Sequence, residues 1–237
     1  MEILKENENF IVINKPAGIS VHPDGKSNQE TISDWFVKQY PEAEYVGESL
    51  NINDKEIPRH GIVHRLDKET SGVMILAKNQ ETFDHLKEQF KNKEVKKIYH
   101  AFIYGNMKDD RGLIDRKIGR EKGGVRRWTT GKFARGILRE ALTNFRVLKR
   151  GKFDGESYCM LEVYPKTGRT HQIRVHMKSI GHPVVADSLY APKYSKILGF
   201  DRLALHARKI VFTDLNGQSI EVEAPYPDDF NSAILLD

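Results

Sequence analysis

The chain has 237 residues, enough for a single large domain or two small ones. Hydrophobic residues make up 39% and charged residues 30%, which is typical of a globular chain and excludes a disordered one. The net charge of +5 is mild, no stretch approaches the roughly 20 apolar residues of a membrane helix, and the N-terminus lacks a secretory signal. The only cysteine, Cys159, cannot form an internal disulfide. We therefore expect a cytoplasmic protein that does not bind membranes.

Strands and helices are both predicted in the first 90 residues. Apolar runs predict strands, and apolar residues at helical spacing predict helices. In chain order these are a strand over 10–13, a helix over 31–40, a loop through roughly Pro58, a strand over 73–77 and a helix over 80–90. Asn79 is a suitable N-cap for the second helix.

The remaining residues continue this mixture. They predict a strand over 98–104, a mobile loop or hairpin insertion over 112–136, a strand over 158–164, a helix over 171–180, and a hairpin formed by 209–213 and 219–223. Gly181 ends the helix, and Asn216-Gly217 is a strong signal for a tight turn. Strands and helices do not alternate as a doubly wound parallel sheet requires. We therefore predict an α+β fold with a largely antiparallel mixed β-sheet flanked by helices and loops.

Positive charge is concentrated in one segment, residues 111–152. It holds 14 Lys or Arg against three acidic residues, a net +11, which leaves −6 for the rest of the chain. Such a distribution is expected of a surface that meets phosphates, although a solvated basic face without a ligand would look the same. The charge distribution therefore suggests a nucleic-acid ligand but does not establish one.

Several cofactor motifs are missing from the sequence. There is no Gly-rich phosphate loop followed by Lys-Ser/Thr, and no dinucleotide fingerprint after a strand. A single cysteine and nine His without a His-Glu-x-x-His pattern give no zinc site. We therefore expect neither a metal nor a cofactor.

The most informative stretch is HGIVHRLDKETSG at residues 60–72, directly before the predicted strand 73–77. It delivers a carboxylate, Asp67, between two cations, Arg65 and Lys68, and nearby cations keep a carboxylate ionised. An ionised Asp in a cleft can act as a nucleophile or a base. The alternative is an Asp that caps a turn, with Thr70 and Ser71 bonded to the local backbone.

This stretch resembles the signature loop of RluA-type pseudouridine synthases, whose Asp is catalytic. Five further segments match in the order of the family: VINKPAGISVHP from Val12, KKIYHAFIYG from Lys96, KTGRTHQIRVHM from Lys166, GHPVVADSLYA from Gly181 and LALHARKIVF from Leu203. The resemblance covers residues 8–228 and implies a pseudouridine-synthase-like fold, a single catalytic domain over 1–237 and an RNA isomerase that needs no cofactor. The small RNA-binding domain that precedes the core in many relatives is not expected here.

The resemblance also implies roles for individual residues. Asp67 would attack the ribose of a flipped-out uridine or remove a proton from it, and the family pattern leaves that choice open. Tyr99 would stack on the target base, and Arg174 would pair with Asp67. Arg65 would fill the space left by the base. Leu205 would line the uracil pocket or simply belong to the core.

Weaker assignments complete the site. His64 assists either the chemistry or the ordering of the loop, and Lys15 belongs to a structural support of the loop. RNA would be gripped by segment 111–152, in particular by Arg126 and Arg127, with Trp128 as a possible stacking ring. The expected partner is a ribosomal RNA or a tRNA, with a slight preference for ribosomal RNA, and not DNA, because no recognition helix is visible. We expect a monomer.

Two other functions fit parts of the pattern. A non-catalytic RNA-binding module would be expected to lack the Asp, Tyr or Arg, but Asp67, Tyr99 and Arg174 are all present. A hydrolase that cleaves a base–sugar bond usually uses two carboxylates, and only Glu69 lies near Asp67 in the sequence. Isomerisation therefore remains the favoured prediction.

Overall fold

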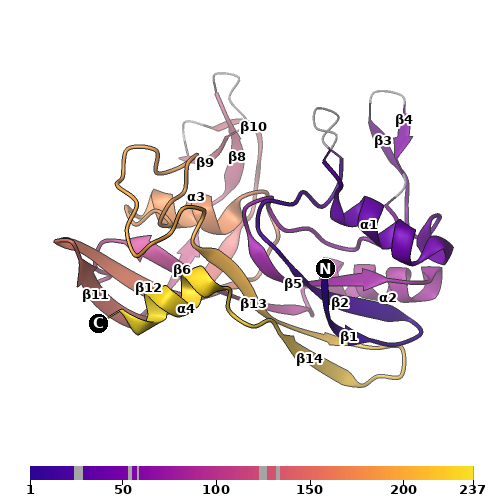
Figure 1. Cartoon of the computed structure of the whole chain (residues 1–237). Coiled ribbons are helices and arrows are strands. Elements are labelled where there is room, and N and C mark those ends of the chain that lie inside the picture. Colours follow the sequence, from indigo (N-terminus) through magenta and orange to yellow (C-terminus); the bar gives the residue numbers. More distant parts are fainter. Residues whose placement is uncertain (24–28, 53–54, 58, 123–126, 132–133, 237) are drawn as a thin grey trace. The chain divides into compact units, whose positions relative to one another are not determined.

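The structure is a computed structural model that describes residues 1–23, 29–52, 55–57, 59–122, 127–131 and 134–236 (Figure 1). Its internal contacts separate two compact units. The first unit comprises Met1–Lys96 and Ala207–Pro225, and the second comprises Lys97–His206 and Tyr226–Asp237. The prediction of a single catalytic domain stays a prediction. Among the described residues, no helix combines the length and the apolar character needed to cross a membrane.

The first unit is built on strands ordered β1-β2-β5-β13, with β14 paired to β13. Strand β13 belongs to this unit from Ala207 onward. Their bounds are Glu2–Glu6 for β1, Phe10–Lys15 for β2, Ser71–Ala77 for β5, Leu205–Thr213 for β13 and Ser219–Glu223 for β14. The helices are α1 (Ile32–Gln39), the short 3-10 helix η1 (Pro41–Ala43) and α2 (Gln80–Lys91). A small hairpin pairs β3 (Leu50–Ile52) with β4 (Lys55–Ile57). The β1–β2, β2–β5 and β13–β14 pairs are antiparallel.

The sequence accounts for the central elements of this unit. Strand β5 is buried along its whole length, as its continuous apolar run requires. Thr31 and Asp34 form a capping box at the start of α1, and Asn79 caps α2 by accepting the backbone N–H of Thr82. The β2–β5 register places Lys15 opposite Gly72, so β2 ends beside the signature loop, residues 60–72.

The second unit contains an antiparallel sheet ordered β6-β12-β11-β7. These strands are β6 (Lys96–Tyr104), β12 (Glu156–Pro165), β11 (Leu142–Phe153) and β7 (Arg111–Asp115). A separate three-stranded sheet, which we call the basic sheet, has the order β10-β8-β9 and consists of β8 (Ile118–Glu121), β9 (Trp128–Thr130) and β10 (Ala134–Arg139). Two helices complete the unit, α3 (Gln172–Ser179) and α4 (Asp228–Leu235).

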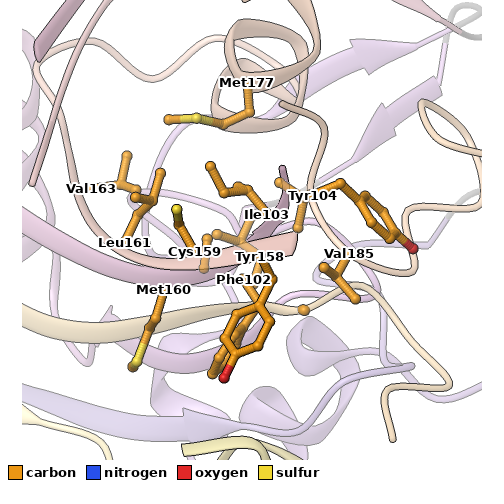
Figure 2. Packing of buried hydrophobic residues seen from close by; sticks show 14 of the residues in the cluster. Phe102, Ile103, Tyr104, Tyr158, Cys159, Met160, Leu161, Val163, Met177 and Val185 are labelled. Carbon is orange, nitrogen blue, oxygen red and sulfur yellow. The ribbon is translucent and has the colours of Figure 1, made fainter. Parts of the chain in front are cut away.

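Strand alternation divides the core of this unit between two faces of the sheet. Cys159, Leu161 and Val163 point to the side of α3, where Met177 meets them, whereas Met160 and Phe102 point the other way (Figure 2). The register pairs Val163 with Tyr99, so Tyr99 shares the α3 side. The alternation of side chains along each strand thus decides which residues can approach α3.

The predicted fold class is confirmed, because both units combine helices with mostly antiparallel strands. All predicted helices and strands occur within a few residues of the expected bounds. The predicted loop through Pro58 was wrong in part, since η1 and the β3–β4 hairpin lie within it. For segment 112–136 the hairpin alternative holds over the described residues, which contribute to β7 and the basic sheet. Helix α4 and strands β1 (Glu2–Glu6) and β11 (Leu142–Phe153) were not anticipated.

Candidate active site

Asp67 lies in the signature loop of the first unit, between the bridge residue Ile62 and strand β5. The loop turns directly after it, because the backbone N–H of Thr70 donates to the Asp67 carbonyl oxygen at 3.1 Å. Asp67 is half-buried, whereas Thr70 and Ser71 are buried behind it. The carboxylate is therefore carried on a short turn whose following residues are fixed in the core.

Lys15 anchors this turn from the end of β2. Its side chain is fully buried, and its Nζ donates to the carbonyl oxygens of Pro16 (2.8 Å), Ile19 (2.9 Å) and Lys68 (3.1 Å). The backbone N–H of Gly18 also donates to the Lys68 oxygen at 2.8 Å. A buried ammonium is tolerated only when such acceptors surround it. These bonds fix the residue that follows Asp67, as the predicted supporting role of Lys15 requires.

Gly72 ends the loop where the chain passes close to β13. Its φ is +112°, and a Cβ there would lie 2.2 Å from the Ala207 carbonyl oxygen. Only glycine fits both the conformation and the approach. The final Gly of the HRLDKETSG pattern therefore has a steric cause.

His64 turns toward the core of the first unit. Its Nε2 accepts the backbone N–H of Ile75 at 3.1 Å, and its ring stacks on Phe90 with centroids 4.8 Å apart. These contacts tie the loop to β5 and α2, so they favour the loop-ordering alternative for His64.

Arg65 is exposed and contributes to a cationic environment around His22. Burial, followed by the positive charges of Arg59, Arg65 and His60, lowers the pKa of His22 to about 4. His22 is therefore neutral at physiological pH, and the positive charges near it are those of Arg59 and Arg65. Such surroundings favour an anionic ligand near the signature loop.

Tyr99, Leu205 and helix α3 all contribute to the large hydrophobic cluster of the second unit. Leu205 is buried in the same cluster as Ile173 and Met177 of α3, and the half-buried Tyr99 packs against that cluster. Three sequence-predicted parts of the site, including the helix that carries Arg174, thus belong to one core cluster.

Arg174 is held by an acidic partner that the sequence did not single out. Its Nε and Nη2 donate to Asp187 Oδ2 and Oδ1, both at 2.8 Å, and the residues are only 7% and 1% exposed. Asp187 Oδ1 also accepts the backbone N–H groups of Leu189 (3.0 Å) and Tyr190 (2.9 Å). This bidentate geometry fixes the plane of the guanidinium. Asp187 lies in the segment GHPVVADSLYA, but a pairing across 13 positions leaves no periodic signal.

A buried polar network holds the first turn of α3. Gln172 donates through Nε2 to Leu142 O (3.0 Å) and Thr143 Oγ1 (2.9 Å), and its Oε1 accepts from Thr167 (2.6 Å). His176 is fully buried, lies 2.9 Å from both Thr143 Oγ1 and Arg116 O, and burial lowers its pKa. The polar residues of KTGRTHQIRVHM therefore attach α3 to β11 and orient the helix that carries Arg174.

The basic sheet contains Trp128, one of the residues predicted to bind RNA. The Arg120 guanidinium lies 5.7 Å from the ring centroid of the half-buried Trp128. Arg127 precedes Trp128 and is half-buried. Arg126 lies outside the described residues.

The predicted site residues thus belong to both units. Asp67, His64 and Arg65 lie in the first, and Tyr99, Arg174, Leu205 and Arg127 lie in the second. The pairing of Asp67 with Arg174 stays a prediction. In the part of the chain that the structure describes, no three His, Cys, Asp or Glu side chains gather into a metal-binding group.

Comparison with known proteins identifies the class. A family profile described as RNA pseudouridylate synthase matches residues 9–179. The structure of human RNA Pseudouridylate Synthase Domain Containing 1 superimposes with a TM-score of 0.75 at 27% identity, over 95% of this chain and 83% of that one. The chain belongs to the RNA pseudouridylate synthase family and is an isomerase.

Sequence relatives agree with this assignment. An uncharacterised RNA pseudouridine synthase of Synechocystis is 35% identical over 99% of this chain and 68% of its own length, and one of Bacillus subtilis is 36% identical over 99% and 72%. Ribosomal large subunit pseudouridine synthase D of Neisseria meningitidis serogroup B is 37% identical over 97% of this chain. The chain spans 59% of the length of that last relative.

Proposed function

We propose that the chain isomerises specific uridines in the RNA of the large ribosomal subunit, with Asp67 as the catalytic carboxylate. The observation that carries the role of Asp67 is its position on a turn that buried Lys15 fixes through the Lys68 carbonyl. The choice of RNA is supported by relatives 37% and 36% identical to this chain that are named as ribosomal large subunit pseudouridine synthases.

The reaction rearranges one nucleoside without a net change in its atoms. The bond between ribose C1′ and uracil N1 breaks, the detached uracil turns, and a new bond forms between C1′ and C5. The proton on C5 is then lost, and N1 gains one. Asp67 acts on the ribose as nucleophile or base. Asp187 holds Arg174 in one orientation, and Arg174 would supply the positive charge that keeps such a carboxylate ionised.

Tyr99 and Leu205 would enclose the uracil after it leaves its stack. Base flipping costs a few kcal/mol, which stacking on an aromatic ring and the insertion of Arg65 into the vacated space would offset. Arg126, Arg127 and Arg120 would bind the flanking phosphates, with Trp128 as a stacking surface. These phosphate contacts would make binding strongly dependent on salt.

The test is tritium release from RNA labelled at uracil C5 and taken from cells that lack this enzyme. Ribosomal RNA and tRNA are supplied separately, and the variants are Asp67→Asn and the matched control Glu69→Gln in the same turn. We expect release by the wild-type protein and by Glu69→Gln on ribosomal RNA, and none by Asp67→Asn. Release by Asp67→Asn would refute the role of Asp67, and release from tRNA alone would refute the proposed substrate.

Product analysis in the same assay separates isomerisation from hydrolysis. An isomerase retains the base in the chain as pseudouridine, whereas a hydrolase frees uracil and leaves an abasic ribose. Free uracil as the main product would overturn the proposed reaction.

A further inference from the structure

Tyr190 lies between α3 and the basic sheet and touches both. It is 3% exposed and packs in a small core cluster with Ile118 of β8, Ala141 and Val175 of α3. The half-buried Trp128 of β9 packs against the same cluster. Tyr190 is therefore placed to link the predicted RNA grip with the helix that carries Arg174.

The Tyr190 hydroxyl bridges these two elements. It accepts the backbone N–H of Trp128 at 3.0 Å and lies 2.9 Å from His171 Nδ1. A phenol can donate one hydrogen bond and accept others, so it can serve both partners at once. One oxygen thus joins the first residue of β9 to the first turn of α3.

His171 occupies a strained position that needs such support. It is the N-cap of α3 with φ at +55°, and its side chain makes no capping hydrogen bond to the helix. A residue other than glycine in the left-handed region persists only where its surroundings hold it there. Because Arg174 follows three positions later, the conformation of His171 sets where the first turn of α3 presents the guanidinium.

The ring and backbone of Tyr190 also contact the Arg174 site directly. The guanidinium carbon of Arg174 lies 5.0 Å from the ring centroid. The Tyr190 backbone N–H donates at 2.9 Å to Asp187 Oδ1, the oxygen that binds Arg174 Nη2. Tyr190 therefore supports the charged group, its acidic partner and the helix start together.

We propose that Tyr190 is a positioning residue that transmits RNA binding at the basic sheet to Arg174. This inference rests on the proposed function, in which Arg174 serves the reaction. RNA that fixes β9 also fixes the Trp128 N–H, and through the hydroxyl it restricts the His171 turn. RNA bound at the basic sheet therefore orders the start of α3, and Arg174 is already ordered when the target uridine reacts.

Kinetics of Tyr190→Phe test the link, because this change removes the hydroxyl and keeps the ring. The matched control is Tyr164→Phe, which removes a hydroxyl bonded to Glu162 on β12 of the same unit. Two substrates are compared after the modified positions in the ribosomal RNA have been mapped: a hairpin that contains the target uridine, and a short single strand with the same local sequence. The hairpin carries the flanking phosphates that the basic sheet is proposed to bind, and the short strand lacks them.

We expect Tyr190→Phe to lower kcat on the hairpin about tenfold, the effect of one or two lost hydrogen bonds, with KM unchanged. Its kcat on the short strand should fall by much less, because there only the hydroxyl's support of His171 is lost and no RNA-induced ordering, and Tyr164→Phe should alter neither. An equal loss on both substrates, a change in KM alone, or no change would overturn the proposal.

Hydrogen exchange gives a readout that does not depend on turnover. Adding the hairpin should slow exchange of the Trp128 amide in the wild-type protein, and Tyr190→Phe should remove most of that slowing. If the hairpin slowed exchange of this amide equally in both proteins, the proposed link through the Tyr190 hydroxyl would be refuted, even if the isomerase activity is present. Slowed exchange in a wild-type protein that releases no tritium would instead refute the proposed function and leave the bridge standing.

Discussion

Replacing Asp187 by Asn should destabilise the second unit by about 3 kcal/mol. Asp187 Oδ1 accepts three hydrogen bonds, from Arg174 Nη2 and the N–H groups of Leu189 and Tyr190, and Oδ2 accepts one from Arg174 Nε. Asn keeps the bonds to one oxygen but turns an N–H toward the Arg174 Nε–H. Breaking a buried ion pair on one side costs about 3–5 kcal/mol, and the lower end applies because these other bonds survive.

Asp229 offers a matched control in the same unit. It binds Arg202 with a similar bidentate geometry, Nε to Oδ2 at 2.7 Å and Nη2 to Oδ1 at 2.9 Å. The two side chains are 17% and 22% exposed, against 8% and 0% for Arg174 and Asp187. Solvent screens this second pair, so Asp229→Asn should cost only about 1 kcal/mol.

Urea unfolding followed by Trp128 fluorescence measures both variants. The chain has two tryptophans, and Trp35 belongs to the first unit, so a Trp35→Phe background leaves Trp128 as the reporter of the second. The free energy is taken from the midpoint and slope of each transition. If Asp187→Asn lowered the free energy of unfolding no more than Asp229→Asn does, the reasoning that burial makes the Arg174 pair costly to break would be refuted.

Three further predictions concern the first unit. The pKa of His22 in the folded protein is lowered to about 4. Its neutral form therefore contributes fully to the free energy of unfolding above pH 6.5, and this contribution is lost as the pH falls toward 4. Stability should decrease by about 2 kcal/mol over that range, and His22→Gln should remove this part of the decrease in urea titrations at a series of pH values. Gly72→Ala should cost more than about 3 kcal/mol or prevent soluble expression, since its Cβ would meet the Ala207 oxygen at 2.2 Å, and near-normal thermal stability would contradict this account. Lys15→Met should lower stability by about 3 kcal/mol and reduce tritium release more than its effect on folding explains, because the Lys68 carbonyl loses its donor; full activity in the folded fraction would contradict it.

The sequence by itself determined most of the central strands and helices, the class and the candidate residues. Continuous apolar runs specify β2 and β5, and helical spacing with local caps specifies α1 and α2. These signals survive in sequence because each depends on neighbours a few positions away. The motif HRLDKETSG placed Asp67 before a buried strand, and the structure has that order.

Only the tertiary structure decided which partners the supporting residues bind. Asp187 binds Arg174 across 13 positions, Lys15 reaches the Lys68 carbonyl across 53, and Tyr190 joins Trp128 across 62. Such contacts leave no periodicity, because they depend on how strands and loops are brought together and not on local spacing. A buried charge needs a polar partner, and the tertiary fold determines which residue lies close enough to be that partner.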